Sequence, residues 1–83
     1  MMSTEARIRS YILENFLFTD VADAFADNDS FLERGIIDST GVLELIFFVE
    51  EQFNIKVADK EMVPENFDSV DNIARFVQRK QAA

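Results

Sequence analysis

The sequence predicts a small all-α protein, a bundle of three main helices plus one short helix. Apolar residues recur at helical spacing in three separate segments, and no run of alternating apolar and polar residues is long enough for a sheet. The length of 83 residues sets the scale, because a chain this short buries enough surface for one core and no more. We therefore expect a single domain, residues 1–83.

The first helix is expected over residues 4–18. A hydroxyl side chain at position 3 or 4 can cap its start. Its buried stripe follows at i, i+4 and i+8 and consists of Ile8, Ile12 and Phe16.

A long loop is expected next. After a weakly helical turn over residues 20–25, the polar run 27–30 competes for backbone hydrogen bonds and favours irregular structure. Apolar residues follow at a density that is typical of a loop held against a core. They are Phe31, Leu32, Ile36 and Ile37. We expect this loop to be ordered.

The strongest helix is expected over residues 40–53, which lack proline and carry a continuous apolar stripe. The stripe consists of Val42, Leu45, Ile46, Val49 and Phe53. Asn54 ends this helix, and a short extended link leads to Asp59, a candidate cap for a turn.

The last part of the chain is expected to hold the short helix and the third main helix. Pro64 suits the first position of a short helix over residues 64–67. Either residue 68 or residue 69 caps the last helix. Its buried stripe consists of Val70, Ile73 and Val77.

The composition limits the possible functions. The chain has 16 acidic and 8 basic residues, a net charge of −8, and neither Cys nor His. It therefore lacks a disulfide framework, a thiol nucleophile and a Ser-His pair, so we expect no enzyme activity of its own. The negative charge disfavours nucleic acid and anionic membranes as partners and favours basic proteins. We see no signal-peptide or membrane segment and expect a soluble, cytoplasmic monomer.

The excess negative charge lies in the middle of the chain. Residues 20–38 hold six acids against one base, and residues 39–59 hold four acids against one base, giving −5 and −3. Both ends are neutral. A solvated acidic surface explains this pattern unless a functional site lies beside it.

Calcium binding is one candidate for the acidic loop. An EF-hand loop starting at Asp27 would have acids at positions 1 and 3. However, position 5 is Phe31, position 6 is Leu32 where the motif needs glycine, and position 12 is Asp38 where it needs Glu. We therefore expect no metal site.

Ser39 lies where the acidic loop meets the strongest helix, directly after Asp38. One interpretation is helix initiation, with either residue as the N-cap. The other is a modification site, because a phosphate at a helix start is stabilised by unpaired N–H groups and by the helix dipole. Attachment of a phosphate ester would need a separate enzyme, since the chain has no His to activate the hydroxyl.

The sequence around Ser39 resembles acyl carrier proteins. The resemblance rests on residues 31–39 (FLERGIIDS), 43–46 (LELI), 50–57 (EEQFNIKV) and 67–70 (FDSV). Residues 35–41 (GIIDSTG) look more like stand-alone carriers of activated amino acids, such as D-alanyl carrier proteins, than like fatty-acid carriers. Thr40 stands where the family usually has Leu.

The resemblance implies that Ser39 carries 4′-phosphopantetheine, which a phosphopantetheinyl transferase takes from coenzyme A, and that Asp38 is the acid preceding it. It implies a carrier of acyl or aminoacyl thioesters. The other partners would be a loading ligase or synthase and downstream transferases with basic docking surfaces.

The partners are expected to meet the second face of the 40–53 helix, which consists of Thr40, Glu44, Phe47 and Glu51. Of Phe47 and Phe48, we expect one in the core and one at the interface. The alternative function is an acidic helical adaptor that binds a basic protein noncovalently.

Overall fold

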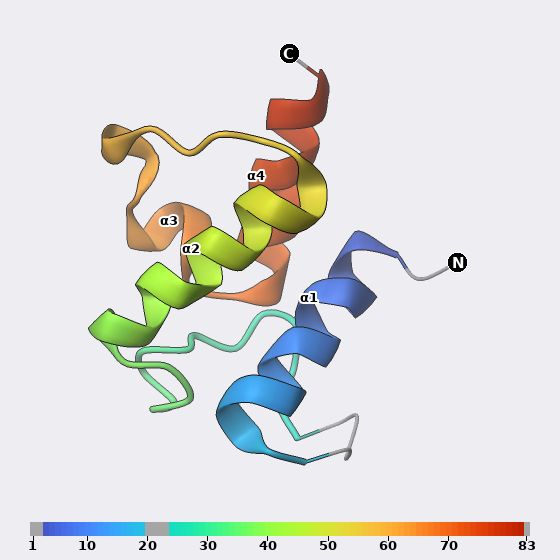
Figure 1. Ribbon diagram of the computed structural model, residues 1–83. Helices are drawn as coiled ribbons and strands as arrows, with labels where there is room; N and C mark the ends of the chain where they lie inside the picture. Colours follow the sequence, from blue (N-terminus) through green and yellow to red (C-terminus); the bar gives the residue numbers. More distant parts are fainter. Residues whose placement is uncertain (1–2, 20–23, 83) are drawn as a thin grey trace.

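The computed structural model describes residues 3–19 and 24–82, and within these ranges the regular structure is entirely helical (Figure 1). The elements in order are α1 (Thr4–Ile12), a π-helical turn (Leu13–Leu17), α2 (Ser39–Phe53), a 3-10 turn (Asp59–Glu61), α3 (Pro64–Phe67) and α4 (Val70–Ala82). The predicted bundle of three main helices and one short helix is confirmed.

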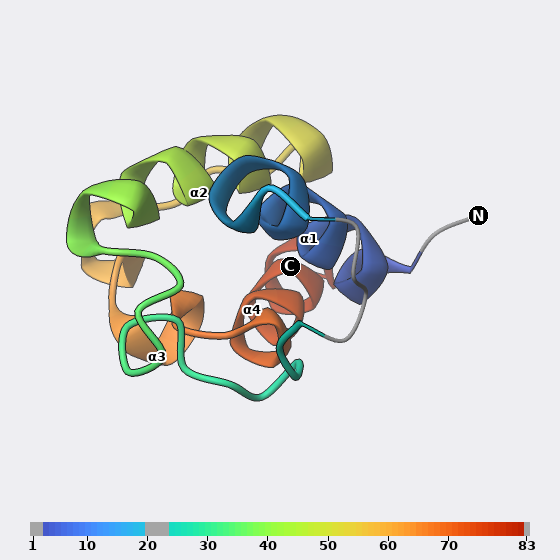
Figure 2. The same ribbon diagram turned by 90° about the horizontal axis from the view of Figure 1, so that it is seen from below.

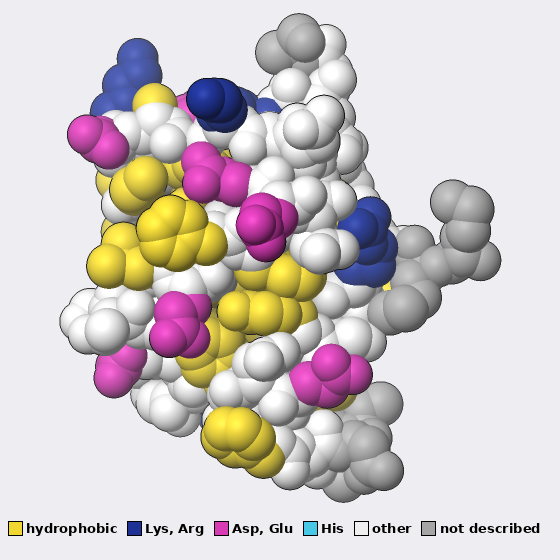
Figure 3. All heavy atoms as spheres, viewed as in Figure 1, with side chains coloured by type: hydrophobic (Ala, Val, Ile, Leu, Met, Phe, Trp, Pro, Cys, Tyr) yellow, Lys and Arg dark blue, Asp and Glu magenta, His cyan; other side chains and the backbone are white. Residues whose placement is uncertain are grey.

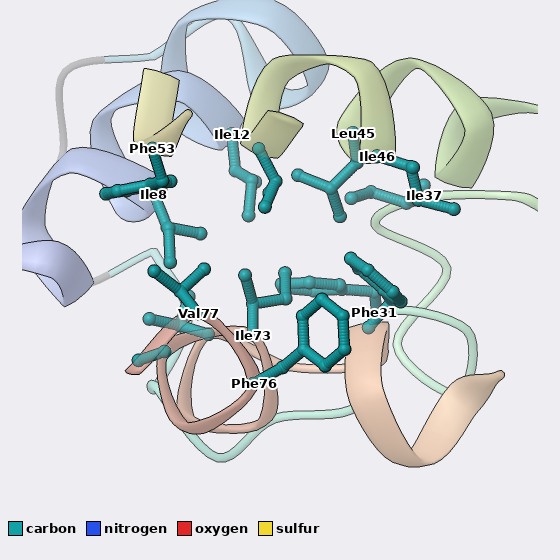
Figure 4. Close-up of a cluster of buried hydrophobic side chains, with 14 of the residues drawn as sticks. Ile8, Ile12, Phe31, Ile37, Leu45, Ile46, Phe53, Ile73, Phe76 and Val77 are labelled. Atoms are coloured by element: carbon teal, nitrogen blue, oxygen red, sulfur yellow. The ribbon is translucent and has the colours of Figure 1, made fainter. Parts of the chain in front are cut away.

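The core lies between α1 and α2 on one side and α4 on the other. Helix α4 packs against both α1 and α3, and Figure 2 shows α1 and α2 side by side, seen from below. In Figure 4 the side chains of α1 and α2 point toward those of α4, and Phe31 and Ile37 of the loop close one end of the cluster.

Helix α1 is predicted correctly at its start and incorrectly at its end. The Ser3 hydroxyl accepts a hydrogen bond from the Ala6 N–H at 3.1 Å and so caps the helix. The helix expected over residues 4–18 runs from Thr4 to Leu17, but its last turn, Leu13–Leu17, is π-helical and not α-helical. Ile12, the last residue of α1, and Leu13, the first residue of the π turn, are both buried.

Three of the four expected apolar residues pack the loop against the core. Phe31 and Ile37 are buried, Ile36 is half-buried, and Leu32 is 44% exposed, so the expectation that Leu32 holds the loop to the core is wrong. The reason is the turn at Asp68, whose backbone carbonyl accepts the Phe31 N–H at 2.8 Å and whose carboxylate accepts the Leu32 N–H at 3.0 Å. This turn directs only Phe31 inward.

Arg9 of α1 holds the start of the described loop. Its guanidinium donates to the Asp27 carboxylate and, at 2.7 Å, to the Phe25 carbonyl, and it lies 4.2 Å from the centre of the Phe25 ring. Asp27 is also tied to α4, because its carbonyl accepts the Asp71 N–H at 2.9 Å. The weakly helical turn expected over residues 20–25 falls mostly on residues 20–23, outside the described part.

The second half of the chain follows the prediction with one correction. Asp59 does not cap the turn: Ala58 takes the cap position, and its N–H donates to the Glu61 carboxylate at 2.9 Å. Pro64 begins α3 as predicted. Of the two candidate caps of α4, Ser69 is the one that accepts the Asn72 N–H, at 3.1 Å.

The predicted stripe of α4 is fully buried. It consists of Val70, Ile73 and Val77.

Candidate functional site

Ser39 is the first residue of α2, and it is exposed. Asp38, not Ser39, is the N-cap: its carboxylate oxygen Oδ1 accepts the Gly41 N–H at 2.7 Å. The cap therefore uses the carboxylate and leaves the neighbouring hydroxyl at the surface.

Close packing fixes the start of α2. Gly35 makes the preceding turn with a φ of 67°, a conformation that favours glycine. A Cβ atom on Gly41 would lie 2.9 Å from Ile37 Cγ2 and 2.9 Å from Phe16 Cε1. The helix start thus lies directly against the loop and the π-helical turn. The sequence pattern contains no sign of this packing role of Gly41.

An apolar cavity of about 250 Å³ opens beside Ser39. It lies between the first half of α2, the loop and α3, with Leu32, Leu43 and Met62 at its exposed edge. Sequence reasoning missed this cavity, because its walls come from three segments that are far apart along the chain. The exposed Leu32 side chain forms part of this apolar surface.

The face of α2 predicted to meet partners is exposed at all four positions: Thr40, Glu44, Phe47 and Glu51. Phe47 is 64% exposed, whereas Phe48 is half-buried and stacks on Tyr11 with ring centroids 3.8 Å apart. Phe47 is therefore the one available for an interface.

Leu43, one helical turn before Phe47, is 53% exposed and extends the apolar part of this face. Its i, i+4 spacing from both Ser39 and Phe47 is the signal that could have identified it. Figure 3 shows hydrophobic side chains gathered over α2 with acidic side chains between them.

The three acids of α2 have different roles. The Glu50 carboxylate accepts the Val57 N–H at 2.9 Å and so holds the link after the helix. Glu44 and Glu51 are exposed. Since α2 contains no Lys or Arg, its surface charge is acidic throughout.

Burial raises the pKa of the Tyr11 hydroxyl, and the nearby negative charge of Glu44 raises it further.

Within residues 3–19 and 24–82, no group of three or more Asp and Glu side chains is arranged to hold a metal ion. In the same part of the chain, no helix is both long enough and apolar enough to cross a membrane.

Comparison with known proteins identifies the family, although no family model matches the sequence. The chain is similar to D-alanyl carrier proteins of Streptococcus pyogenes serotype M5 (strain Manfredo), serotype M49 (strain NZ131) and serotype M1. Each is 35% identical over 78 residues, which cover 92% of this chain and 98% of the relative. The chain therefore belongs to the carrier-protein family that includes these D-alanyl carrier proteins, and it is a carrier rather than an enzyme.

Proposed function

We propose that this protein carries an acyl or aminoacyl group as a thioester on 4′-phosphopantetheine attached to Ser39. One observation supports this most strongly: Ser39 lies exposed at the start of α2 while Asp38 already caps the helix. D-alanine is the first cargo to test, because the similar proteins are named D-alanyl carrier proteins.

The surroundings of Ser39 fit such a group in two respects. A phosphodiester on the Ser39 oxygen would lie at the N-terminus of a 15-residue helix, where the dipole and unpaired N–H groups stabilise negative charge. The apolar cavity beside Ser39 offers a surface to the less polar parts of the arm and its cargo. When bound, the group supplies the thiol that a chain without Cys lacks.

Attachment requires a transferase. A bond forms between the Ser39 oxygen and the phosphorus that carries the pantetheine. The bond from that phosphorus to the rest of the coenzyme A diphosphate breaks, and adenosine 3′,5′-bisphosphate leaves. The Ser39 proton passes to a base of the transferase, since this chain has no His.

The partners in this proposal are the transferase, a ligase or synthase that loads the cargo, and downstream transferases. Their basic surfaces would meet Glu44 and Glu51, and an apolar contact would form on Phe47, with Thr40 beside the modified serine. We further propose that the chain works as a monomer of one domain, residues 1–83, in the cytoplasm.

Intact-mass measurement tests this proposal. The chain is incubated with coenzyme A, magnesium and a phosphopantetheinyl transferase of broad specificity. Wild type is expected to gain one phosphopantetheinyl group and Ser39→Ala none. No gain by wild type contradicts the proposal and favours the noncovalent adaptor; a gain by Ser39→Ala shows that the site is assigned wrongly.

A further inference from the structure

Phe18 is unusual in two ways. Its side chain is 82% exposed, and its backbone is in the left-handed region with φ 53° and ψ 45°. The other positive-φ residues in the described part of the chain are Gly35 and Asn54, types that adopt this conformation readily. An aromatic residue in this conformation is disfavoured, and burial of its ring does not offset the cost.

The π-helical turn creates this arrangement. The carbonyl of Leu13 accepts the N–H groups of both Phe18 and Thr19, the latter at 3.0 Å, and so closes the turn behind Phe18. Single π turns within helices occur frequently at functional sites. Here the π turn holds the Phe18 ring out into solvent.

Phe18 borders an open groove of about 480 Å³ between the π turn, the loop and the first turn of α2. Phe16 and Ile36 contribute apolar surface, and the close approach of Phe16 to Gly41 brings the groove up to the helix start. Asp38 and Thr40, the two neighbours of Ser39, both line it. Ser39 itself lines the apolar cavity on the other side of the helix start, so a protein that occupies this groove lies directly beside Ser39.

The charged residues that line the groove are both acidic, Asp38 and Glu44. A complementary partner would carry Lys or Arg around an apolar recess that accepts the Phe18 ring. An enzyme that binds coenzyme A has such cations, because phosphate groups are held by Lys and Arg.

We propose that this groove is a docking surface for the phosphopantetheinyl transferase, with the Phe18 ring as its apolar anchor. The proposal rests on the proposed function of Ser39. It selects the transferase because this enzyme must bring its active site to the Ser39 hydroxyl itself. Later partners act at the far end of the arm, so their contacts with Thr40 and Glu44 need not extend to the Phe18 ring.

The test is the rate of Ser39 modification, measured by intact mass at varied concentrations of the chain. Phe18→Gly and Phe18→Asn remove the ring but suit the left-handed backbone, so both variants should be at least as stable as wild type. We expect each to lower kcat/KM about tenfold, mainly by raising KM, as loss of an aromatic anchor does. Phe18→Tyr keeps the ring and should restore the wild-type rate.

Asn54→Gly is the matched control. It makes a comparable change at an exposed left-handed residue, but at the other end of the 15-residue α2, about 22 Å along the helix from Ser39. This variant should be modified at the wild-type rate.

Three outcomes would overturn the proposal. Wild-type rates for Phe18→Gly and Phe18→Asn would show that the ring takes no part in docking. Slowing by Asn54→Gly to the same extent, or a loss of thermal stability that parallels the slower rate, would assign the effect to the fold. If wild type itself gains no mass, the function proposed for Ser39 fails as well, so the two failures can be distinguished.

Discussion

Replacing Asp38 by Ala should destabilise the fold through one identifiable hydrogen bond. The Asp38 carboxylate accepts the Gly41 N–H at 2.7 Å and caps α2. Loss of such a cap costs about 1 kcal/mol. The negative charge at the helix start adds about 0.3–1 kcal/mol, toward the lower end here because Asp38 is exposed. The total is about 1–2 kcal/mol.

This loss should lower the melting temperature by about 4–8 °C for each kcal/mol in a domain of this size. Thermal unfolding at pH 7, followed by circular dichroism, measures it. Asp38→Asn keeps an oxygen acceptor and loses only the charge, so its melting temperature should fall by much less. Ser39→Ala, at the exposed neighbouring position, should leave the stability close to that of wild type.

Equal stability of Asp38→Ala and wild type would refute the capping argument. Equal destabilisation by Asp38→Asn and Asp38→Ala would show that the charge, and not the hydrogen bond, supplies the stability.

Three further predictions concern the loop, the docking face and the loss of stability at acid pH. Arg9→Ala should lower the free energy of unfolding in urea by about 1.5–3 kcal/mol, because it removes charge-assisted bonds to the loop; full stability of the variant would contradict this. Glu44→Lys and Glu51→Lys should slow Ser39 modification with little change in melting temperature. The control Asp59→Lys, at an exposed residue outside α2, should change neither the rate of modification nor the melting temperature. Equal loss of folding and modification would count against docking. The Ala58 N–H first, and Lys80 second, lower the pKa of the Glu61 carboxyl. The stability that the ionised Glu61 carboxylate contributes is therefore complete above its unfolded pKa of 4.5 and is lost as pH falls through the lower folded pKa. Glu61→Gln should lose stability at pH 7 and show a weaker fall in melting temperature under acid; identical pH profiles would argue against this role.

The helices were predictable because each main helix carries an apolar stripe at helical spacing, as Val70, Ile73 and Val77 do in α4. The π turn was not, because residues 12–17 carry apolar side chains that suit either helix type. In the fold this turn lies close to Gly41, where a Cβ atom would be 2.9 Å from Phe16 Cε1. Phe47 and Phe48 could not be distinguished within five consecutive apolar residues. The stacking of Phe48 on Tyr11, which lies far away in the sequence, decides between them.

The position of Ser39 at a helix start was predictable from local sequence, since Asp-Ser before an apolar stripe is typical of a helix N-terminus. The apolar cavity and the Phe18 groove were not. Both are assembled from segments that meet only in the folded chain, and the exposure of Leu32 and Phe18 runs against their hydrophobic character.

Peptide mapping of the chain after incubation with coenzyme A and the transferase tests the carrier account most directly. Trypsin cleavage after Arg34 and Lys56 yields residues 35–56, a peptide whose only hydroxyl side chains are Ser39 and Thr40. The account predicts one phosphopantetheinyl group on this peptide, retained in Thr40→Val and lost in Ser39→Ala. An unmodified peptide, or a group that persists in Ser39→Ala, would contradict it.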